Sequence, residues 1–256
     1  KDGIQNFEVV RQSLIVETDL LKKLKHDNLP SIIDIIDQDD NFLIVMDYIE
    51  GITLDKVIKE YGPQKQDDVV NWAIQLCDVL CYLHTRKPPI IYRDMKPSNV
   101  MLKYDGSVVL IDFGTAREYK ERASGDTACL GTQGYAAPEQ FGGQGQTDAR
   151  TDIYCLGATM YHLLTGHNPS EPPYEMYPIT YWDASLSSGL EGIILKCTQK
   201  NPEDRYQTAE ELMYALQNYR DLDAPMIRKY KHRVISFATS AALAVLCGVM
   251  AVTMHV

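Results

Sequence analysis

The sequence predicts an α+β fold in which a small sheet precedes a mainly helical region, with one apolar helix at the C-terminal end. Three observations support this prediction. Two short runs rich in β-branched residues lie in the first fifth of the chain, at 32–36 and 42–46. Helical spacing of apolar residues then dominates from residue 67 onward, around a cluster of polar loops. Residues 234–256 form an apolar run without Asp, Glu, Lys or Arg.

The composition is that of a globular chain with an acidic balance. Of its 256 residues, 45% are hydrophobic and 23% charged, which argues against general disorder. A net charge of −10 excludes a general nucleic-acid binder, because such a protein needs a basic face against phosphates. The six cysteines form no C-x-x-C pair and most lie in apolar helical stretches. We therefore expect free thiols and a cytosolic globular part.

The first elements follow from apolar spacing. Residues 14–25 have the spacing of a helix. The runs 32–36 and 42–46 are separated by Asp39-Asp40-Asn41, so we expect an antiparallel strand pair. A long helical pattern follows over residues 67–85 and ends at Pro88-Pro89.

The second half combines short strands, one long loop and helices. Residues 114–150 have no sustained period and predict a long functional loop. Helical patterns return from Asp152 onward, and Thr208 with Glu211 predicts a capping box that opens a helix through Leu216. Three short strands are expected before the loop, at 90–91, 100–102 and 108–111.

The apolar run 234–256 is long enough to cross a hydrocarbon core of about 30 Å as a helix. A basic segment, residues 223–233, precedes it and predicts that residues 1 to about 230 face the cytoplasm. A buried core helix is the alternative. A homodimer through the span is possible, but the run contains no G-x-x-x-G.

Asp94, Lys96, Asn99 and Asp112 suggest phosphoryl transfer. This reaction needs a base near the attacking hydroxyl, a metal clamp on the phosphates and charge neutralisation. Asp94 suits the base, and Lys96 suits neutralisation of the transferring group. Asn99 and Asp112 offer the hard oxygen ligands that Mg²⁺ prefers.

The spacing of these residues resembles the protein kinase signature. Asp94-x-Lys96-x-x-Asn99 is followed thirteen residues later by Asp112-Phe113-Gly114, and then by Gly131-Thr132-Gln133-Gly134-Tyr135-Ala136-Ala137-Pro138-Glu139. The resemblance implies a two-lobe fold that uses ATP and Mg²⁺. Together with the apolar run and its basic flank, it divides the chain into a partial N-lobe up to the hinge, a C-lobe, a basic juxtamembrane segment and a transmembrane helix, at residues 1–49, 50–222, 223–233 and 234–256.

The resemblance also assigns ATP-binding residues. Glu17 resembles the helix glutamate whose family partner is a strand lysine that holds the ATP phosphates. Met46 resembles the gatekeeper, and Asp47 to Ile49 resemble the hinge whose backbone groups hold adenine. Leu21, Ile35, Tyr92 and Phe113 would stack as the apolar spine between the lobes.

Other matching residues imply a serine/threonine kinase with a structured activation segment. Thr132 would bond Asp94 and Lys96 and shape the substrate site. Asp152 would anchor the backbone of the catalytic loop. Glu139 and Arg205 would form the buried ion pair that ties the activation segment to the lower lobe.

Arg93, before the catalytic Asp, is typical of kinases that are switched by loop phosphorylation. A phosphate on Thr127, or with less support on Ser124, would pair with Arg93. Plain loop polarity is the alternative reading of both hydroxyls.

The sequence departs from the family pattern in two places. Tyr92 stands where the family usually has His, and we expect its ring to fill that place without loss of activity. No G-x-G-x-x-G or V-A-I-K strand precedes Glu17. We therefore expect an incomplete kinase sequence rather than a natural half-kinase.

The favoured reading is a single-span membrane kinase of the bacterial receptor-like type, which phosphorylates Ser/Thr of cytoplasmic proteins. A pseudokinase-like membrane scaffold is the alternative, favoured by the absent lysine. A small-molecule kinase is a weaker third reading, because residues 131–139 suit a peptide.

Overall fold

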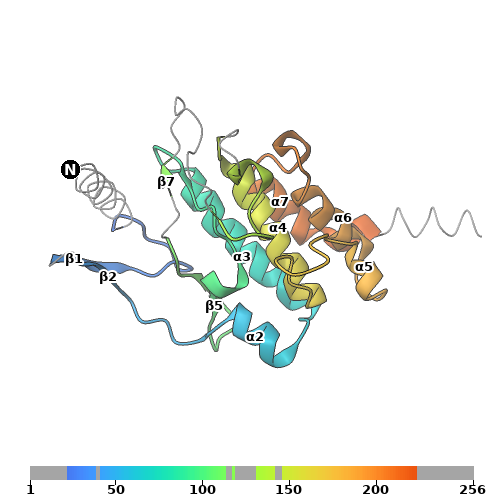
Figure 1. The fold of residues 1–256 in the computed structure, drawn as a ribbon, viewed down its shortest axis with the longest axis horizontal. Coiled ribbons are helices and arrows are strands. Elements are labelled where there is room, and N and C mark those ends of the chain that lie inside the picture. Colours follow the sequence, from blue (N-terminus) through green and yellow to red (C-terminus); the bar gives the residue numbers. More distant parts are fainter. Residues whose placement is uncertain (1–21, 39–40, 114–116, 119–130, 142–145, 224–256) are drawn as a thin grey trace, which may run out of the picture.

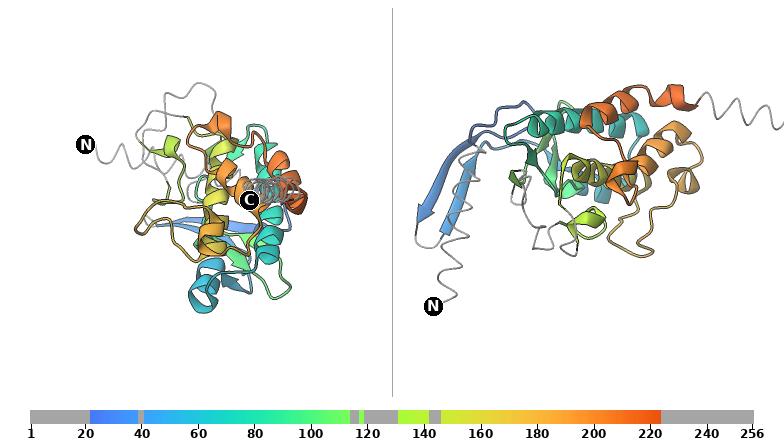
Figure 2. Two further views of the ribbon diagram at one scale, coloured as in Figure 1. Left: turned by 90° about the vertical axis from the view of Figure 1, so that its right-hand side faces the viewer. Right: turned by 90° about the horizontal axis from the view of Figure 1, so that it is seen from above.

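The computed structural model describes residues 22–38, 41–113, 117–118, 131–141 and 146–223. A two-stranded ribbon extends from one end of a mainly helical body (Figures 1 and 2). The ribbon pairs β1 (Ile32–Gln38) with β2 (Asn41–Met46) in antiparallel register, with a bulge between Ile32 and Asp34. The predicted strand pair is confirmed.

The chain enters the helical body through β3 (Ile52–Thr53) and α2 (Leu54–Tyr61). Thr53 starts α2 because its side chain accepts a hydrogen bond from the amide of Lys56 at 3.3 Å. Gly62 ends the helix at a φ of 75°, a conformation in which glycine meets no Cβ penalty.

Two long helices, α3 (Gln66–His84) and α4 (Ala149–Thr165), form the centre of the body (Figure 1). Every residue of α4 from Thr151 to Thr165 except Tyr154 is buried, so α4 is surrounded by protein on all sides. Its neighbours are α3 and three shorter helices: α5 (Ile179–Trp182), α6 (Ser188–Cys197) and α7 (Ala209–Gln217).

Short strands position the polar loops. β5 (Val100–Leu102) lies between β3 and β6 (Val108–Leu110), and β4 (Ile90–Ile91) pairs with β7 (Arg117–Glu118). The loop at residues 92–99 therefore runs from β4 to β5, and residues 111–113 follow β6. The amide of Ile111 donates to the carbonyl oxygen of Asn99 at 3.0 Å, which joins the two loops directly.

The elements match the sequence prediction with four local differences. The described end of the predicted helix 14–25, residues 22–25, is not helical, and residues 14–21 lie outside the described ranges. α4 begins three residues before Asp152, after the cap Asp148. β7 lies inside the predicted long loop.

The fourth difference is at the capping box of α7. Thr208 Oγ accepts from the amide of Glu211 at 3.1 Å, as predicted. The carboxylate of Glu211, however, accepts from the amide of Gln207 at 2.9 Å, one residue earlier than in a standard box.

Among the described residues, no helix is both long and apolar enough to cross a membrane. The segments 224–233 and 234–256 lie outside those residues, so the predicted span remains a prediction. The four described cysteines, Cys77, Cys81, Cys155 and Cys197, are free thiols. Burial raises the pKa of the Cys77, Cys155 and Cys197 thiols well above the ordinary thiol value, which disfavours the reactive thiolate.

Candidate active site

Asp94 lies at the centre of a hydrogen-bonded cluster in the loop between β4 and β5. Its Oδ2 accepts from Lys96 Nζ at 2.8 Å and from Asn99 Nδ2 at 3.0 Å. Its Oδ1 accepts from Thr132 Oγ1 at 2.9 Å, and the same hydroxyl accepts from Lys96 Nζ at 2.6 Å. The structure therefore contains both hydrogen bonds of Thr132 that the resemblance implied.

These contacts fix the orientation of the Asp94 carboxylate. A carboxylate offers about four lone-pair positions, and three are filled by Thr132, Lys96 and Asn99. The Asp94 side chain is mostly buried and keeps 10% of its surface exposed. This arrangement suits a base that receives one proton from a hydroxyl group of defined position.

The backbone hydrogen bond from Ile111 to Asn99 places the loop that carries Asp112 beside the loop that carries Asn99. Asn99 Nδ2 is occupied by the carbonyl oxygen of Asp94, at 2.9 Å, and by the Asp94 carboxylate. Its Oδ1 accepts a long hydrogen bond from Ser98 Oγ at 3.3 Å and has a second lone pair. Asp112 has an exposed side chain.

This pair of oxygen donors fits Mg²⁺, which is held in phosphotransferases by one or two protein oxygens together with phosphates and water. Within the described ranges, no group of three or more His, Cys, Asp and Glu side chains is arranged to hold a metal ion.

Asp152, on α4, anchors the backbone of the loop at residues 92–99. Its Oδ1 accepts from the amide of Arg93 at 2.6 Å, and its Oδ2 accepts from the amide of Tyr92 at 2.9 Å. The side chain is fully buried. The geometry is the one the resemblance implied for Asp152.

Sequence reasoning missed His84, the last residue of α3. Its Nε2 lies 2.8 Å from Asp152 Oδ2, so the buried carboxylate links two central helices as well as the loop. A histidine at a helix end carries no sequence signal for such a contact, because Asp152 is 68 residues away.

Two further side chains hold loop carbonyl groups and were also missed. Gln140 Nε2 donates to the carbonyl oxygen of Arg93 at 2.8 Å, and Thr159 Oγ1 donates to that of Met95 at 3.1 Å. Arg93 itself is buried and has a left-handed φ of 70°, a conformation that a non-glycine residue rarely adopts. The contacts of Asp152 and Gln140 on both sides of Arg93 stabilise this conformation.

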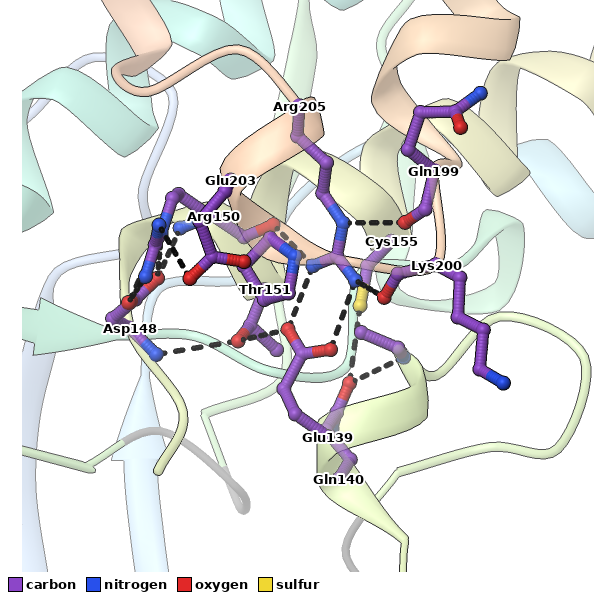
Figure 3. Close-up of polar contacts among 12 residues, drawn as sticks. Glu139, Gln140, Asp148, Arg150, Thr151, Cys155, Gln199, Lys200, Glu203 and Arg205 are labelled. Carbon is purple, nitrogen blue, oxygen red and sulfur yellow. Dashed lines mark hydrogen bonds and ion pairs between the residues drawn. The ribbon is translucent and has the colours of Figure 1, made fainter. Parts of the chain in front are cut away.

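Arg205 and Glu139 form the buried ion pair that the sequence predicted (Figure 3). Arg205 Nη1 lies 2.7 Å from Glu139 Oε1, and Nη2 lies 2.9 Å from Oε2, in a bidentate geometry. The other three donors of the guanidinium bind the carbonyl oxygens of Gln199, Arg150 and Lys200 at 2.8, 3.1 and 3.0 Å. All five donors of Arg205 are therefore satisfied.

Part of the predicted apolar spine is present. The Tyr92 and Phe113 rings meet edge to face, with centroids 5.5 Å apart. Burial, followed by the charges of Asp112 and Asp94, raises the pKa of the Tyr92 phenol well above its ordinary value. Leu21 and the side chain of Ile35 lie outside the described parts of the chain.

The remaining predicted residues are at the edges of the described structure. The amide of Asp47 donates to the carbonyl oxygen of Ser31 at 3.0 Å, and the amide of Ser31 donates to Asp47 Oδ2 at 3.1 Å. Ile49 is half-buried two residues further on. Glu17 and Thr127 lie outside the described residues.

Comparison with known proteins agrees with this geometry. Residues 3–216 match the family described as Protein kinase domain. The serine/threonine-protein kinase PrkC of Bacillus subtilis is 32% identical over 219 residues, which cover 81% of this chain and 33% of PrkC. PknB of Mycobacterium tuberculosis is 33% identical over 220 residues, 78% of this chain and 34% of PknB.

A solved structure supports the same fold. The kinase domain of PknI from Mycobacterium tuberculosis aligns with a TM-score of 0.66 at 25% identity, covering 82% of this chain and 78% of that one. This chain belongs to the protein kinase domain family, with bacterial serine/threonine kinases among its relatives. It spans about a third of the length of the curated relatives named above.

Proposed function

We propose that this chain transfers the γ-phosphoryl group of ATP to serine and threonine hydroxyl groups of proteins. The observation that supports this most is the Asp94 carboxylate, which is oriented by Lys96, Asn99 and Thr132 and retains one acceptor position. A hydroxyl group hydrogen-bonded at that position would lose its proton to Asp94 as it attacks phosphorus.

The neighbouring residues serve the same reaction. Lys96 Nζ, 2.8 Å from Asp94, places a positive charge where negative charge spreads over the transferring oxygens. Asn99 and Asp112 would hold Mg²⁺, which supplies neutralisation of the ATP phosphates when bound. Adenine would bind to backbone groups between Asp47 and Ile49.

Substitution of Asp94 tests the proposal. Asp94→Asn keeps the size and the hydrogen-bond acceptor but removes the base, so we expect phosphotransfer from labelled ATP to a protein acceptor to fall by about 10²- to 10⁴-fold. Asp105→Asn is the matched control, because Asp105 is a surface carboxylate in the turn before β6. Equal transfer by the wild type and Asp94→Asn would refute the proposed base.

A scaffold without phosphotransfer is the second candidate. Absence of transfer by the wild-type chain, together with retained nucleotide-independent binding to a partner, would favour it. Transfer that depends on Asp94 would exclude it.

The location proposed for the catalytic domain is the cytoplasmic face of a membrane. The support is the apolar run 234–256 with its basic flank at 223–233. Insertion of two lysines near the centre of the run should release the chain from membranes into the alkaline-carbonate supernatant. Release of the wild type under the same treatment would contradict an integral span.

Control by phosphorylation of Thr127 is part of the proposal. The support is Arg93, whose residue type and place in the sequence directly before Asp94 suit a phosphate partner. Mass mapping after incubation with ATP and Mg²⁺ should find phosphate on Thr127, and the substitution Thr127→Ala should lower activity. Phosphate only at sites outside the segment 114–130 would contradict it.

A further inference from the structure

Residues Thr132 to Tyr135 form a turn beside the carboxylate of Asp94. Thr132 bonds both Asp94 and Lys96 through its hydroxyl. The amides of Tyr135 and Ala136 donate to the carbonyl oxygen of Thr132 at 3.0 and 2.9 Å, which closes a tight turn. An acceptor protein whose hydroxyl reaches Asp94 would lie beside this turn, in which Gln133 is exposed.

A second turn, residues 166–171, follows α4 and is internally rigid. Gly166 ends α4 with a left-handed φ of 73°. Asn168 then organises the turn: its Oδ1 accepts from the amide of Ser170 at 2.9 Å, and its Nδ2 donates to Glu171 Oε1 at 3.0 Å. The amide of Glu171 donates back to the carbonyl oxygen of Asn168 at 3.0 Å.

The two turns meet at three consecutive residues. Ser170 Oγ donates to the carbonyl oxygen of Gln133 at 2.5 Å. Gly134, at a φ of 87°, packs so closely on Pro169 and Ser170 that an added Cβ would lie 2.5 Å from the amide nitrogen of Ser170. No side chain larger than hydrogen fits there without separation of the turns.

Tyr135 provides the third contact. Its hydroxyl oxygen lies 2.5 Å from His162 Nδ1 and 3.3 Å from Asn168 Oδ1. Burial lowers the pKa of His162 to about 4, so at neutral pH its ring is uncharged and can accept the phenol hydrogen. The Tyr135 side chain is thereby held between α4 and the second turn.

We propose that Ser170, supported by Asn168, is a positioning residue for the protein substrate. It holds the carbonyl group of Gln133, the residue that follows Thr132 in the turn beside Asp94. This inference rests on the proposed kinase function. It assigns a role in substrate positioning to the turn at residues 166–171, for which no hydrogen bond to Asp94 or Lys96 is described.

The matched variants are Ser170→Ala, which removes the hydroxyl, Ser170→Thr, which keeps it, and Ser185→Ala. Ser185 Oγ makes a comparable turn hydrogen bond to Asp183 Oδ1, at 2.7 Å, and is exposed. Loss of one such hydrogen bond at the substrate turn should raise the KM for a Ser/Thr acceptor about three- to tenfold. The KM for ATP and the ATP hydrolysis without acceptor should stay unchanged.

The experiment uses the full chain with myelin basic protein as the acceptor probe, and hydrogen exchange as a second readout. Ser170→Ala should raise the acceptor KM and speed exchange of the Tyr135 and Ala136 amides. Ser170→Thr should restore both, and Ser185→Ala should change neither. An unchanged acceptor KM, or equal changes in acceptor KM and ATP KM, would overturn the inference.

The two readouts separate this inference from the proposed function. If the wild type transfers no phosphate, the proposed function fails, and the substrate role of Ser170 fails with it. The exchange rates would then still decide whether Ser170 holds the turn. If the wild type is active but Ser170→Ala changes neither readout, only the present inference is refuted.

Discussion

Arg205→Ala is expected to unfold the helical lobe rather than to change its chemistry. The side chain of Arg205 has 0% exposure and its five donors meet five acceptors (Figure 3). The substitution removes the charged partner of Glu139, whose side chain is only 9% exposed. The carboxylate of Glu139 would still accept a hydrogen bond from the hydroxyl of Thr151, at 2.9 Å. It also removes the guanidinium donors that bind the carbonyl oxygens of Gln199, Arg150 and Lys200.

The loss of stability expected for Arg205→Ala can be estimated from the burial of this ion pair. Removal of one partner from a buried ion pair costs about 3–5 kcal/mol, because the other charge stays buried and uncompensated. That cost is a large part of the roughly 5–15 kcal/mol by which domains are stable. For a domain of this size, about 2–4 °C per kcal/mol predicts a fall in Tm of roughly 6–20 °C.

The assay is thermal unfolding followed by circular dichroism, with Arg220→Ala as the control. Arg220 also pairs with a carboxylate: its Nη2 donates to Oδ1 and Oδ2 of Asp67 at 2.7 and 2.8 Å, but both side chains are more than 60% exposed. Its removal should change Tm far less. The double variant Arg205→Met, Glu139→Leu should recover stability relative to Arg205→Ala, because no buried charge remains.

Two results would refute this reasoning. A Tm of Arg205→Ala within about 2 °C of the wild type would show that the pair does not hold the lobe. A chain that stays folded but loses turnover per folded molecule would show a catalytic role for Arg205. The predicted outcome is a smaller folded fraction with unchanged turnover in that fraction.

Three further predictions follow from other buried groups. Asp152→Ala leaves the amides of Tyr92 and Arg93 buried without their acceptor, so the free energy of unfolding should fall by about 2–6 kcal/mol in urea titrations. Tyr92→His keeps an aromatic ring in the same place, so turnover in the kinase assay should stay within a few-fold. Burial lowers the pKa of His162 from 6.5 to about 4 in the folded chain. Between about pH 4 and 6.5 the unfolded chain therefore binds a proton at His162 that the folded chain does not bind. The free energy of unfolding should therefore fall as pH drops from about 6.5 towards 4, and this component should vanish in His162→Gln, whose amide can still accept from Tyr135.

Each of these predictions has a contrary outcome. Wild-type stability of Asp152→Ala would mean that the loop amides find other partners. A large gain of turnover in Tyr92→His would mean that Tyr92 limits the chemistry. Identical pH dependence of stability in the wild type and His162→Gln would mean that His162 does not remain neutral in the folded chain.

Much of the fold could be predicted because it depends on local spacing. The helix predicted at 67–85 is observed at Gln66–His84, since its apolar period follows the face that packs in the core. The strand pair before it is observed in antiparallel register because a polar turn separates two β-branched runs. The short strand Arg117–Glu118 was missed, because two residues carry no period and its pairing with Ile90–Ile91 is long-range.

The helix boundaries were predicted less well, for a physical reason. The start of α4 depends on the cap Asp148, which accepts from the amide of Arg150 at 2.8 Å, and not on where the apolar period begins. The capping residue of α7 was predicted correctly, yet its glutamate reaches back to Gln207 instead of Thr208. Which residues cap a helix depends on the local turn geometry that tertiary packing imposes.

The sequence alone determined which groups are available for the chemistry. Asp94, Lys96, Asn99 and Asp112 have the required types at the required spacing, and spacing is a property of the chain itself. The contacts of Thr132 with Asp94 and Lys96 could be anticipated only through the family resemblance.

Only the tertiary structure decided how these groups are held in place. His84, Gln140, Thr159 and Ser170 each contact a loop or a carboxylate that is between 37 and 68 residues distant in the chain. Hydrogen bonds of this kind need only one donor and one acceptor that the fold brings to about 3 Å, and many residue types supply them. Such positions therefore leave no pattern in the sequence, although they help to hold the loop at residues 92–99 and the turn at residues 132–135 in place.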